Sequence, residues 1–183
     1  RIKDIEIAKK ETELQETEIN EEQISREKSS KLVGKKYIGE VLDKVDYVGE
    51  AKIYSDKNSN GEIIHILKDF DKVRLLETLP YGWFKVELED GRVGYVDATY
   101  IRAEEIPPHN YDENSKEWVV KFSNDSQRVN IYHNGKLVKK SIASGGIRDT
   151  FTPKGVFQVE SGRRGEWFFS ERYQQGGKYW VGF

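Results

Sequence analysis

The chain has 183 residues, of which 34% are charged, and its 30 basic and 32 acidic side chains give a formal net charge of -2. This near balance offers no basic face for nucleic acid and argues against a polybasic membrane anchor. No apolar run in the sequence is long enough to span a bilayer.

Cysteine is absent, which rules out disulfides, thiolate metal sites and a cysteine nucleophile within these residues. The histidines His65, His109 and His133 are scattered, so no metal-ligand spacing is present and neither a metal nor another cofactor is expected. The chain begins with Arg1 rather than Met. We therefore expect residues in front of it, where a signal peptide or an anchoring helix could lie.

Residues 1–36 contain no aromatic residue and are rich in Glu and Lys. Glu6 and Lys10, and again Glu22 and Arg26, have the i,i+4 spacing that supports a solvated helix. This stretch is therefore predicted to be a charged helical stalk or spacer. Its apolar residues do not keep a heptad, which makes a coiled-coil dimeriser the less supported alternative.

From residue 37 the sequence changes to short strands, and the clearest example is residues 83–96. Phe84, Val86 and Leu88 alternate with polar residues, and Asp90-Gly91 then supplies a tight hairpin turn. Further strand candidates lie around residues 63–67 and 73–75. Short strands joined by tight turns predict a small barrel.

The same segment resembles the bacterial SH3-like domain, whose members often end with "G-W-x-K-V … G-x-x-G-W/Y-V … Y-L". The matching residues are Gly82, Trp83, Lys85, Val86, Gly91, Gly94, Tyr95, Val96, Tyr100 and Ile101. We assign the domain to residues 37–103, with its core at 48–103. Family members commonly bind cell-wall peptides or polysaccharide, so the resemblance makes Trp83 and Tyr95 candidate wall-binding residues. Packing in the core is the alternative for both, and for Tyr95 it is at least as well supported.

Residues 104–115 are predicted to be a linker, because Ile106-Pro107-Pro108 disfavours a helix and the polar residues that follow have no period. A second domain is expected over 116–183. It opens with strand candidates at 118–122, 127–132 and 137–144, the last two joined by an Asn134-Gly135 hairpin turn. This order predicts a β-meander. Residues 151–157 are predicted to be a turn that leads into another strand.

The second domain resembles the opening of the L,D-transpeptidase catalytic domain, which typically reads "x-Q-x-L-x-V-Y-x-N-G-x-L-V", then "x-S-x-G", then "T-P-x-G-x-F". The matching residues are Gln127, Val129, Ile131, Tyr132, Asn134, Gly135, Lys136, Leu137, Val138, Ser144, Gly145, Thr152, Pro153, Gly155 and Phe157. Residues 179–183 resemble the aromatic segment before the family's histidine strand. By this resemblance Tyr179, Trp180 and Phe183 could line a substrate cleft, with core packing as an equal alternative.

The family's active site is a later segment of the form "H-G … S-x-G-C-x-R", in which His activates the Cys nucleophile. No such segment is present, so no catalytic residue is assigned, and the family's Cys and His would lie beyond Phe183. Either the chain is a piece of a longer enzyme, or it is a naturally truncated, non-catalytic wall protein. The first is favoured, because a half-sheet ending in apolar aromatics would leave an aggregation-prone edge.

Other chemistry is less supported by the sequence. Ser144-Gly145-Gly146 could cradle a phosphate, but no P-loop Lys-Ser/Thr follows and a turn is the better interpretation. The Thr152 segment is typical of a β-turn rather than of a nucleophile with a Lys base. His133 is expected to be exposed in a hairpin. The arginines at 163, 164 and 172 could bind an anionic wall polymer, but a solvated loop is the preferred interpretation.

Together these observations predict a mainly β protein: a small SH3-like barrel and an incomplete, β-sandwich-like L,D-transpeptidase domain, with an N-terminal charged helix. The resemblance implies a cell-wall cross-linking enzyme that acts on peptidoglycan stem peptides outside the cytoplasm, with roles in wall biogenesis and cell shape. Without a thiol this chain is expected to be inactive alone. The alternative is a non-catalytic scaffold that binds the wall through its barrel. A eukaryote-style SH3 domain for Pro-rich peptides fits poorly, because such domains use an acidic specificity loop.

Overall fold

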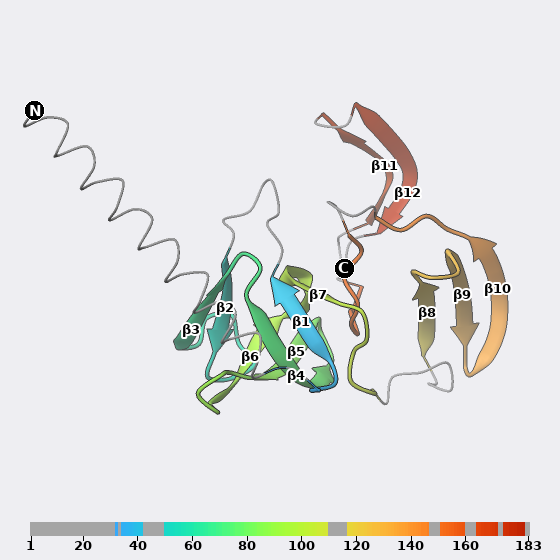
Figure 1. The fold of residues 1–183 in the computed structure, drawn as a ribbon. Helices are drawn as coiled ribbons and strands as arrows, with labels where there is room; N and C mark the ends of the chain where they lie inside the picture. The colour runs from blue at the N-terminus through green and yellow to red at the C-terminus, as the bar shows by residue number, and fades with distance from the viewer. Residues whose placement is uncertain are drawn as a thin grey trace, which may run out of the picture.

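The computed structural model describes residues 32, 34–41, 50–109, 117–146, 151–159, 164–171 and 174–181. These residues form a seven-stranded sheet, a three-stranded sheet and a two-stranded hairpin, and every strand pairing is antiparallel (Figure 1). The prediction of a mainly β fold is therefore confirmed. The charged helix predicted for residues 1–36 lies outside the described residues, apart from 32 and 34–36.

The seven-stranded sheet has the order β3-β2-β6-β5-β4-β1-β7 and bends into a small barrel (Figure 1). Its elements are β1 (Ile38–Val41), β2 (Glu50–Tyr54), β3 (Ile63–Lys68), β4 (Lys72–Leu79), β5 (Trp83–Glu87), β6 (Val93–Asp97), the 3-10 turn η1 (Ala98–Tyr100) and β7 (Ile101–Ala103). The second sheet is a meander of β8 (Trp118–Ser123), β9 (Arg128–His133) and β10 (Lys136–Ile142). The hairpin consists of β11 (Arg164–Ser170) and β12 (Gln175–Val181).

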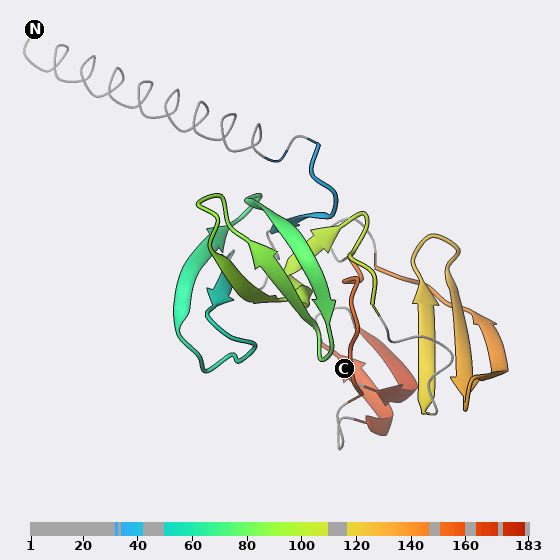
Figure 2. The same ribbon diagram turned by 90° about the horizontal axis from the view of Figure 1, so that it is seen from below.

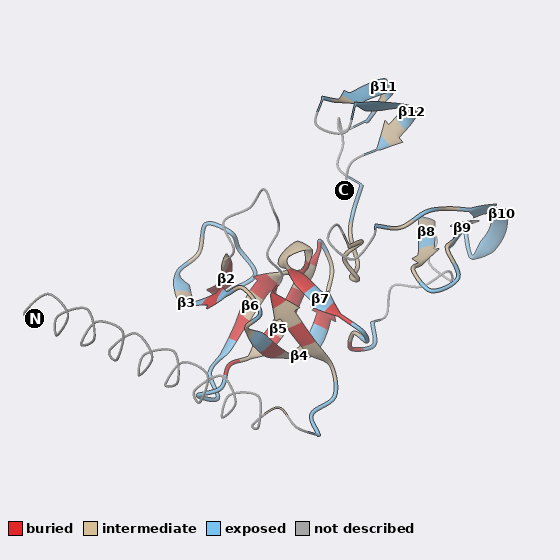
Figure 3. Cartoon of the chain, turned by 45° about the horizontal axis from the view of Figure 1, so that its top comes forward, coloured by how far each residue is buried: buried red, intermediate tan, exposed pale blue. Residues whose placement is uncertain are grey.

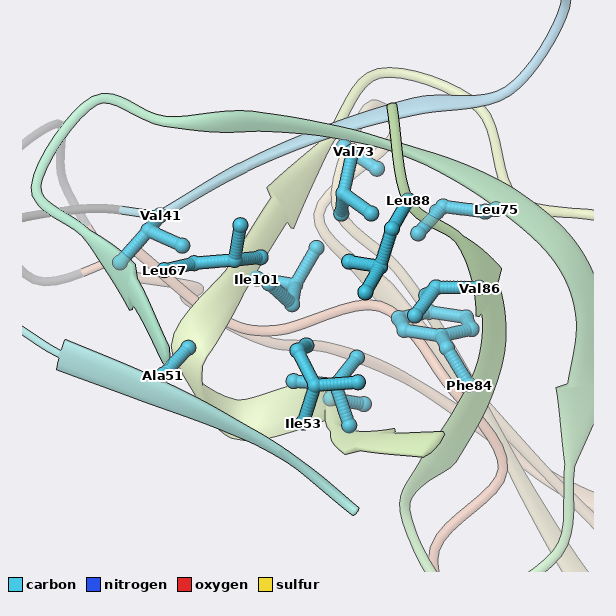
Figure 4. Packing of buried hydrophobic residues seen from close by; sticks show 13 residues of the cluster. Val41, Ala51, Ile53, Leu67, Val73, Leu75, Phe84, Val86, Leu88 and Ile101 are labelled. Carbon is cyan, nitrogen blue, oxygen red and sulfur yellow. The ribbon is translucent and has the colours of Figure 1, made fainter. Parts of the chain in front are cut away.

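Alternation along the strands builds the barrel core, because successive side chains of a strand point to opposite faces. In β5 the side chains of Phe84 and Val86 are fully buried, whereas those of Trp83, Lys85 and Glu87 are half-buried on the other face. The buried chains of several strands point toward one another in Figure 4. The largest of them are Phe84, Ile53, Leu75, Ile101, Val41, Val73, Val86 and Val96.

The two tight turns predicted from the sequence are confirmed. Gly91 has a φ of +84°, and the Asp90 carboxylate accepts bonds from the Arg92 main-chain amide at 2.9 Å and from Arg92 Nε at 2.7 Å. The Arg92 amide is the main reason why the pKa of Asp90 lies below its ordinary value. Asn134 and Gly135, at φ +50° and +71°, join β9 to β10 in the same left-handed region.

Burial is distributed unevenly along the chain. All the fully buried side chains lie in the barrel and the segment that leaves it, and no described residue from 117 onward is buried (Figure 3). Large apolar side chains of the later strands are exposed instead, including 79% of Ile142 and 78% of Tyr179. The described part of the second domain therefore has no core of its own.

The predicted linker begins as part of the barrel. Pro107 is buried, and its carbonyl accepts a 2.7 Å bond from the buried hydroxyl of Thr78. Ile106 also packs against the barrel core. The chain therefore stays packed on the barrel as far as Pro107. Residues 110–115 of the predicted linker lie outside the described residues.

Residues 151–159 contain no strand, and the next described element is β11, so the predicted turn that leads into a strand stays a prediction. In this segment Val156 O accepts a bond from Gly82 N of the barrel. One local prediction for the second domain is wrong. The segment around Trp167 is not a solvated loop but strand β11, which pairs with β12 from Arg164 to Ser170. Its arginines suggested a solvated segment, whereas the cross-strand pairing decides its conformation.

Phe84→Ala is expected to lower the free energy of unfolding by about 3–5 kcal/mol, because it empties the centre of the barrel core. Phe70→Ala is the matched control, since 66% of the Phe70 side chain is exposed, and it should change stability by no more than about 0.5 kcal/mol. Urea unfolding of the two variants measures the difference. Equal losses in both variants would contradict this account of the core.

Candidate functional site

Three aromatic side chains lie together on the outer face of the barrel. Tyr54 of β2 is opposite Tyr95 of β6 in the sheet register, and Trp83 of β5 lies two pairs further along, on the same face. The rings of Tyr54 and Trp83 meet edge to face, with centroids 5.8 Å apart and planes at 74°. All three are half-buried. We call Tyr54, Trp83 and Tyr95 the aromatic face.

The structure thus brings together the two residues that were predicted as wall contacts. Neither Trp83 nor Tyr95 belongs to the buried core, because Phe84 and Val96 take the inward positions beside them. The alternative of simple core packing is therefore not what the barrel shows. Their role in binding stays a prediction.

Tyr81 and Lys57 extend the aromatic face at one side. Tyr81 is 62% exposed in the turn between β4 and β5, and the Lys57 ammonium lies 5.1 Å from the centre of its ring. This contact joins the β2–β3 loop to the turn that precedes Trp83. The surface consequently offers aromatic rings beside a cation, a combination suited to binding rather than to proton transfer.

Neither Tyr54 nor Tyr81 is among the residues predicted from the sequence. For Tyr54 a signal existed, because Ala51 and Ile53 alternate with Lys52 and Tyr54 along β2, which places Tyr54 on the outward side. For Tyr81 no periodic signal existed. Its place depends on a turn with a φ of +66°, which an aromatic residue rarely adopts.

A hollow of about 250 Å³ lies elsewhere on the barrel. It is lined by His65, Phe70 and Leu88, among others, and it contains none of the residues of the aromatic face. Within the described part of the chain, no group of three or more His, Cys, Asp or Glu side chains is placed to hold a metal ion. No helix among the described residues has the length and apolar character needed to cross a bilayer.

Of the three predicted substrate residues of the second domain, the structure describes Tyr179 and Trp180, and these two differ in exposure. Tyr179 is strongly exposed, whereas the adjacent Trp180 is half-buried and meets Phe168 edge to face with centroids 6.5 Å apart. Tyr179 has a φ of +59°, which departs from regular strand geometry. Phe183 lies outside the described residues. A shared cleft lined by these residues stays a prediction.

Two residues of the L,D-transpeptidase-like motif, Gln127 and Thr152, accept hydrogen bonds from the main chain that follows β10. Gln127 Oε1 accepts a 2.6 Å bond from Gly145 N, and Thr152 Oγ1 accepts a 2.7 Å bond from Gly146 N. Both glycine amides are therefore already occupied by side chains. A phosphate cradle at Ser144-Gly145-Gly146 has no free amide at these two positions, so the preference against it is supported.

His133 was expected to be exposed in a hairpin, and it lies at the end of β9, half-buried. Its ring stacks on Trp118 of the paired strand β8, with centroids 4.2 Å apart and planes at 10°. Asn134 Nδ2 lies 3.4 Å from His133 Nε2. This arrangement gives His133 a packing role in the described sheet.

Comparison with known proteins gives two matches. Residues 49–102 match the bacterial SH3 domain family. A protein of Bacillus subtilis (strain 168) named "Putative L,D-transpeptidase YciB" is 45% identical over 58 residues, which are 30% of this chain and 29% of that protein. The chain therefore matches less than a third of that relative's length. It carries a bacterial SH3 domain and is similar over 58 residues to an L,D-transpeptidase-like protein.

Proposed function

We propose that this chain has a peptidoglycan-related role, in which the aromatic face of the barrel binds the bacterial cell wall. The observation that carries the proposal is the gathering of Tyr54, Trp83 and Tyr95 on the outside of a domain that matches the bacterial SH3 family. The relative named as an L,D-transpeptidase supports the same setting. A wall ligand implies that the protein works outside the cytoplasm.

The physical basis of binding is the flat, amphipathic surface of the rings. Tyr and Trp offer a large contact area at a small cost in conformational entropy. Sugar rings and peptide planes of the wall can stack on them, while Lys57 and Lys85 beside the face can contact carboxylates of stem peptides. Lys85 pairs with Tyr95 in the register, so a cation lies within the face itself.

The second domain, we propose, is part of an L,D-transpeptidase. In that family a Cys thiolate attacks the carbonyl between a diamino acid and a terminal D-amino acid of a stem peptide. The D-amino acid leaves with a proton on its amine, and a thioester remains. The amine of a second stem then attacks the thioester, which forms the cross-link and frees the thiol. This chain has no cysteine, so residues outside it would supply the nucleophile.

A scaffold without catalysis is the second candidate. It is favoured by the restriction of the buried core to the barrel within the described residues. In this case the barrel is the working part, and binding of the wall is the whole function. Both candidates require the aromatic face.

Substitutions on the aromatic face test wall binding. Trp83→Ala and Tyr54→Ala are each expected to weaken binding to purified sacculi about tenfold, because each removes a stacking surface. Phe70→Ala, which removes an exposed ring outside the face, is the matched control and should bind like the unmodified chain. Co-sedimentation at increasing sacculus concentration gives the affinities. Failure of the unmodified chain to sediment would refute the proposal.

An extension of the chain separates the enzyme from the scaffold. The chain alone should form no cross-link between tetrapeptide stems, because it lacks a thiol. The same chain joined to the family's His- and Cys-bearing segment should form cross-linked dimers, detectable by mass spectrometry. An extended protein with Cys→Ala at the nucleophile is the control. If the extended protein folds and still makes no product, the scaffold is supported against the enzyme.

A further inference from the structure

Residues 151–159 form a strap between the barrel and the three-stranded sheet. Figure 2 shows this segment, in orange, passing between the two. At its start, the Thr152 carbonyl accepts a 3.2 Å bond from Asn124 Nδ2, which ties the strap to the second sheet. Further along, Val156 O accepts a 2.8 Å bond from Gly82 N of the barrel. The Lys154 ammonium also donates to the carbonyl of Glu104.

Phe157 of the strap packs against the barrel core. Its ring is partly buried against the barrel core and covers Gly82. A Cβ built on Gly82 would lie 2.9 Å from the ring atoms Cδ1 and Cε1, which is closer than real Cβ contacts. A Cβ on Gly155 would lie 3.4 Å from the Cβ of Ala98. The strap therefore packs on Gly82 and Ala98 of the barrel.

Gly82 directly precedes Trp83 of the aromatic face. Tyr81 and Gly82 both have a positive φ, at +66° and +73°, and the tyrosine pays a steric cost for it. Both backbone groups of Gly82 are occupied, because its amide donates to Val156 O and its carbonyl accepts from Ala98 N at 2.7 Å. The strap thus supplies one of the two main-chain hydrogen bonds that Gly82 makes.

We propose that Phe157 is a positioning residue for the aromatic face. By holding the turn at Tyr81 and Gly82, it sets the Trp83 ring against Tyr54 and keeps Tyr81 within reach of Lys57. A preorganised face binds more tightly, because less conformational entropy is lost when the ligand arrives. A segment of the second domain therefore contributes to the affinity of the barrel. Only the identity of the ligand rests on the proposed function, because the positioning of Trp83 by Phe157 takes place within the chain.

The first test follows the Trp83 ring in the folded chain. The sequence has four tryptophans, so a 15N spectrum has four indole N–H resonances, and Trp83→Phe identifies the one from Trp83. Phe157→Ala should shift this resonance and leave the others in place, except for any close to the strap. Phe157→Leu, which keeps an apolar contact but lacks the ring, should shift it less. Phe70→Ala is the control and should leave it unchanged.

The second test measures sacculus affinity at a temperature where every variant is folded. Phe157→Ala should weaken binding about tenfold and Phe157→Leu about threefold, although Phe157 does not belong to the aromatic face. A purely stabilising role would lower the unfolding midpoint and leave the folded-state affinity and the Trp83 resonance as they are. Should Phe157→Ala not fold, Phe157→Leu decides by the same two readouts.

The outcomes separate this inference from the proposed function. If the unmodified chain binds sacculi and the Phe157 variants bind equally well, the positioning role is overturned. If the unmodified chain does not bind, the proposed wall-binding function fails, and the Trp83 resonance alone decides the positioning. An unmoved resonance in folded Phe157→Ala overturns the positioning role in either case.

Discussion

The alternation of side chains along β5 and β6 is the constraint on which the barrel depends. Phe84, Val86 and Val96 fill the core because every second residue points inward, and the same rule turns Trp83 and Tyr95 outward. A register slip by one residue would exchange the two sets and would destroy the core and the aromatic face together. Stability of the fold and presentation of the candidate site thus share one cause.

The two parts of the chain contribute unequally to this arrangement. The barrel buries its own core, whereas the described strands of the second domain expose large apolar side chains on both sheets. The strap links the two, since Thr152 is bonded to the second sheet and Phe157 is seated on the barrel. The TPxGxF-like segment therefore contacts both the barrel and the three-stranded sheet.

Local patterns predicted much of the fold. The Asp90-Gly91 and Asn134-Gly135 turns need residues that tolerate a positive φ, and alternating apolar residues marked β5 and β9. The position of the strap could not be predicted, because it depends on the fit of Phe157 over Gly82, which are far apart in the sequence. For the same reason Tyr54 was missed as the partner of Trp83: two strands must first pair with β6 before these rings can meet.

The central claim is that the aromatic face binds wall material, and a titration of the full chain with soluble peptidoglycan fragments tests it most directly. Resonances of Tyr54, Tyr81, Trp83 and Tyr95 should shift together and saturate at one fragment concentration, while those of His65 and Phe70, at the hollow elsewhere on the barrel, should stay in place. Shifts confined to the hollow, or no saturable shift on the aromatic face, would contradict the account.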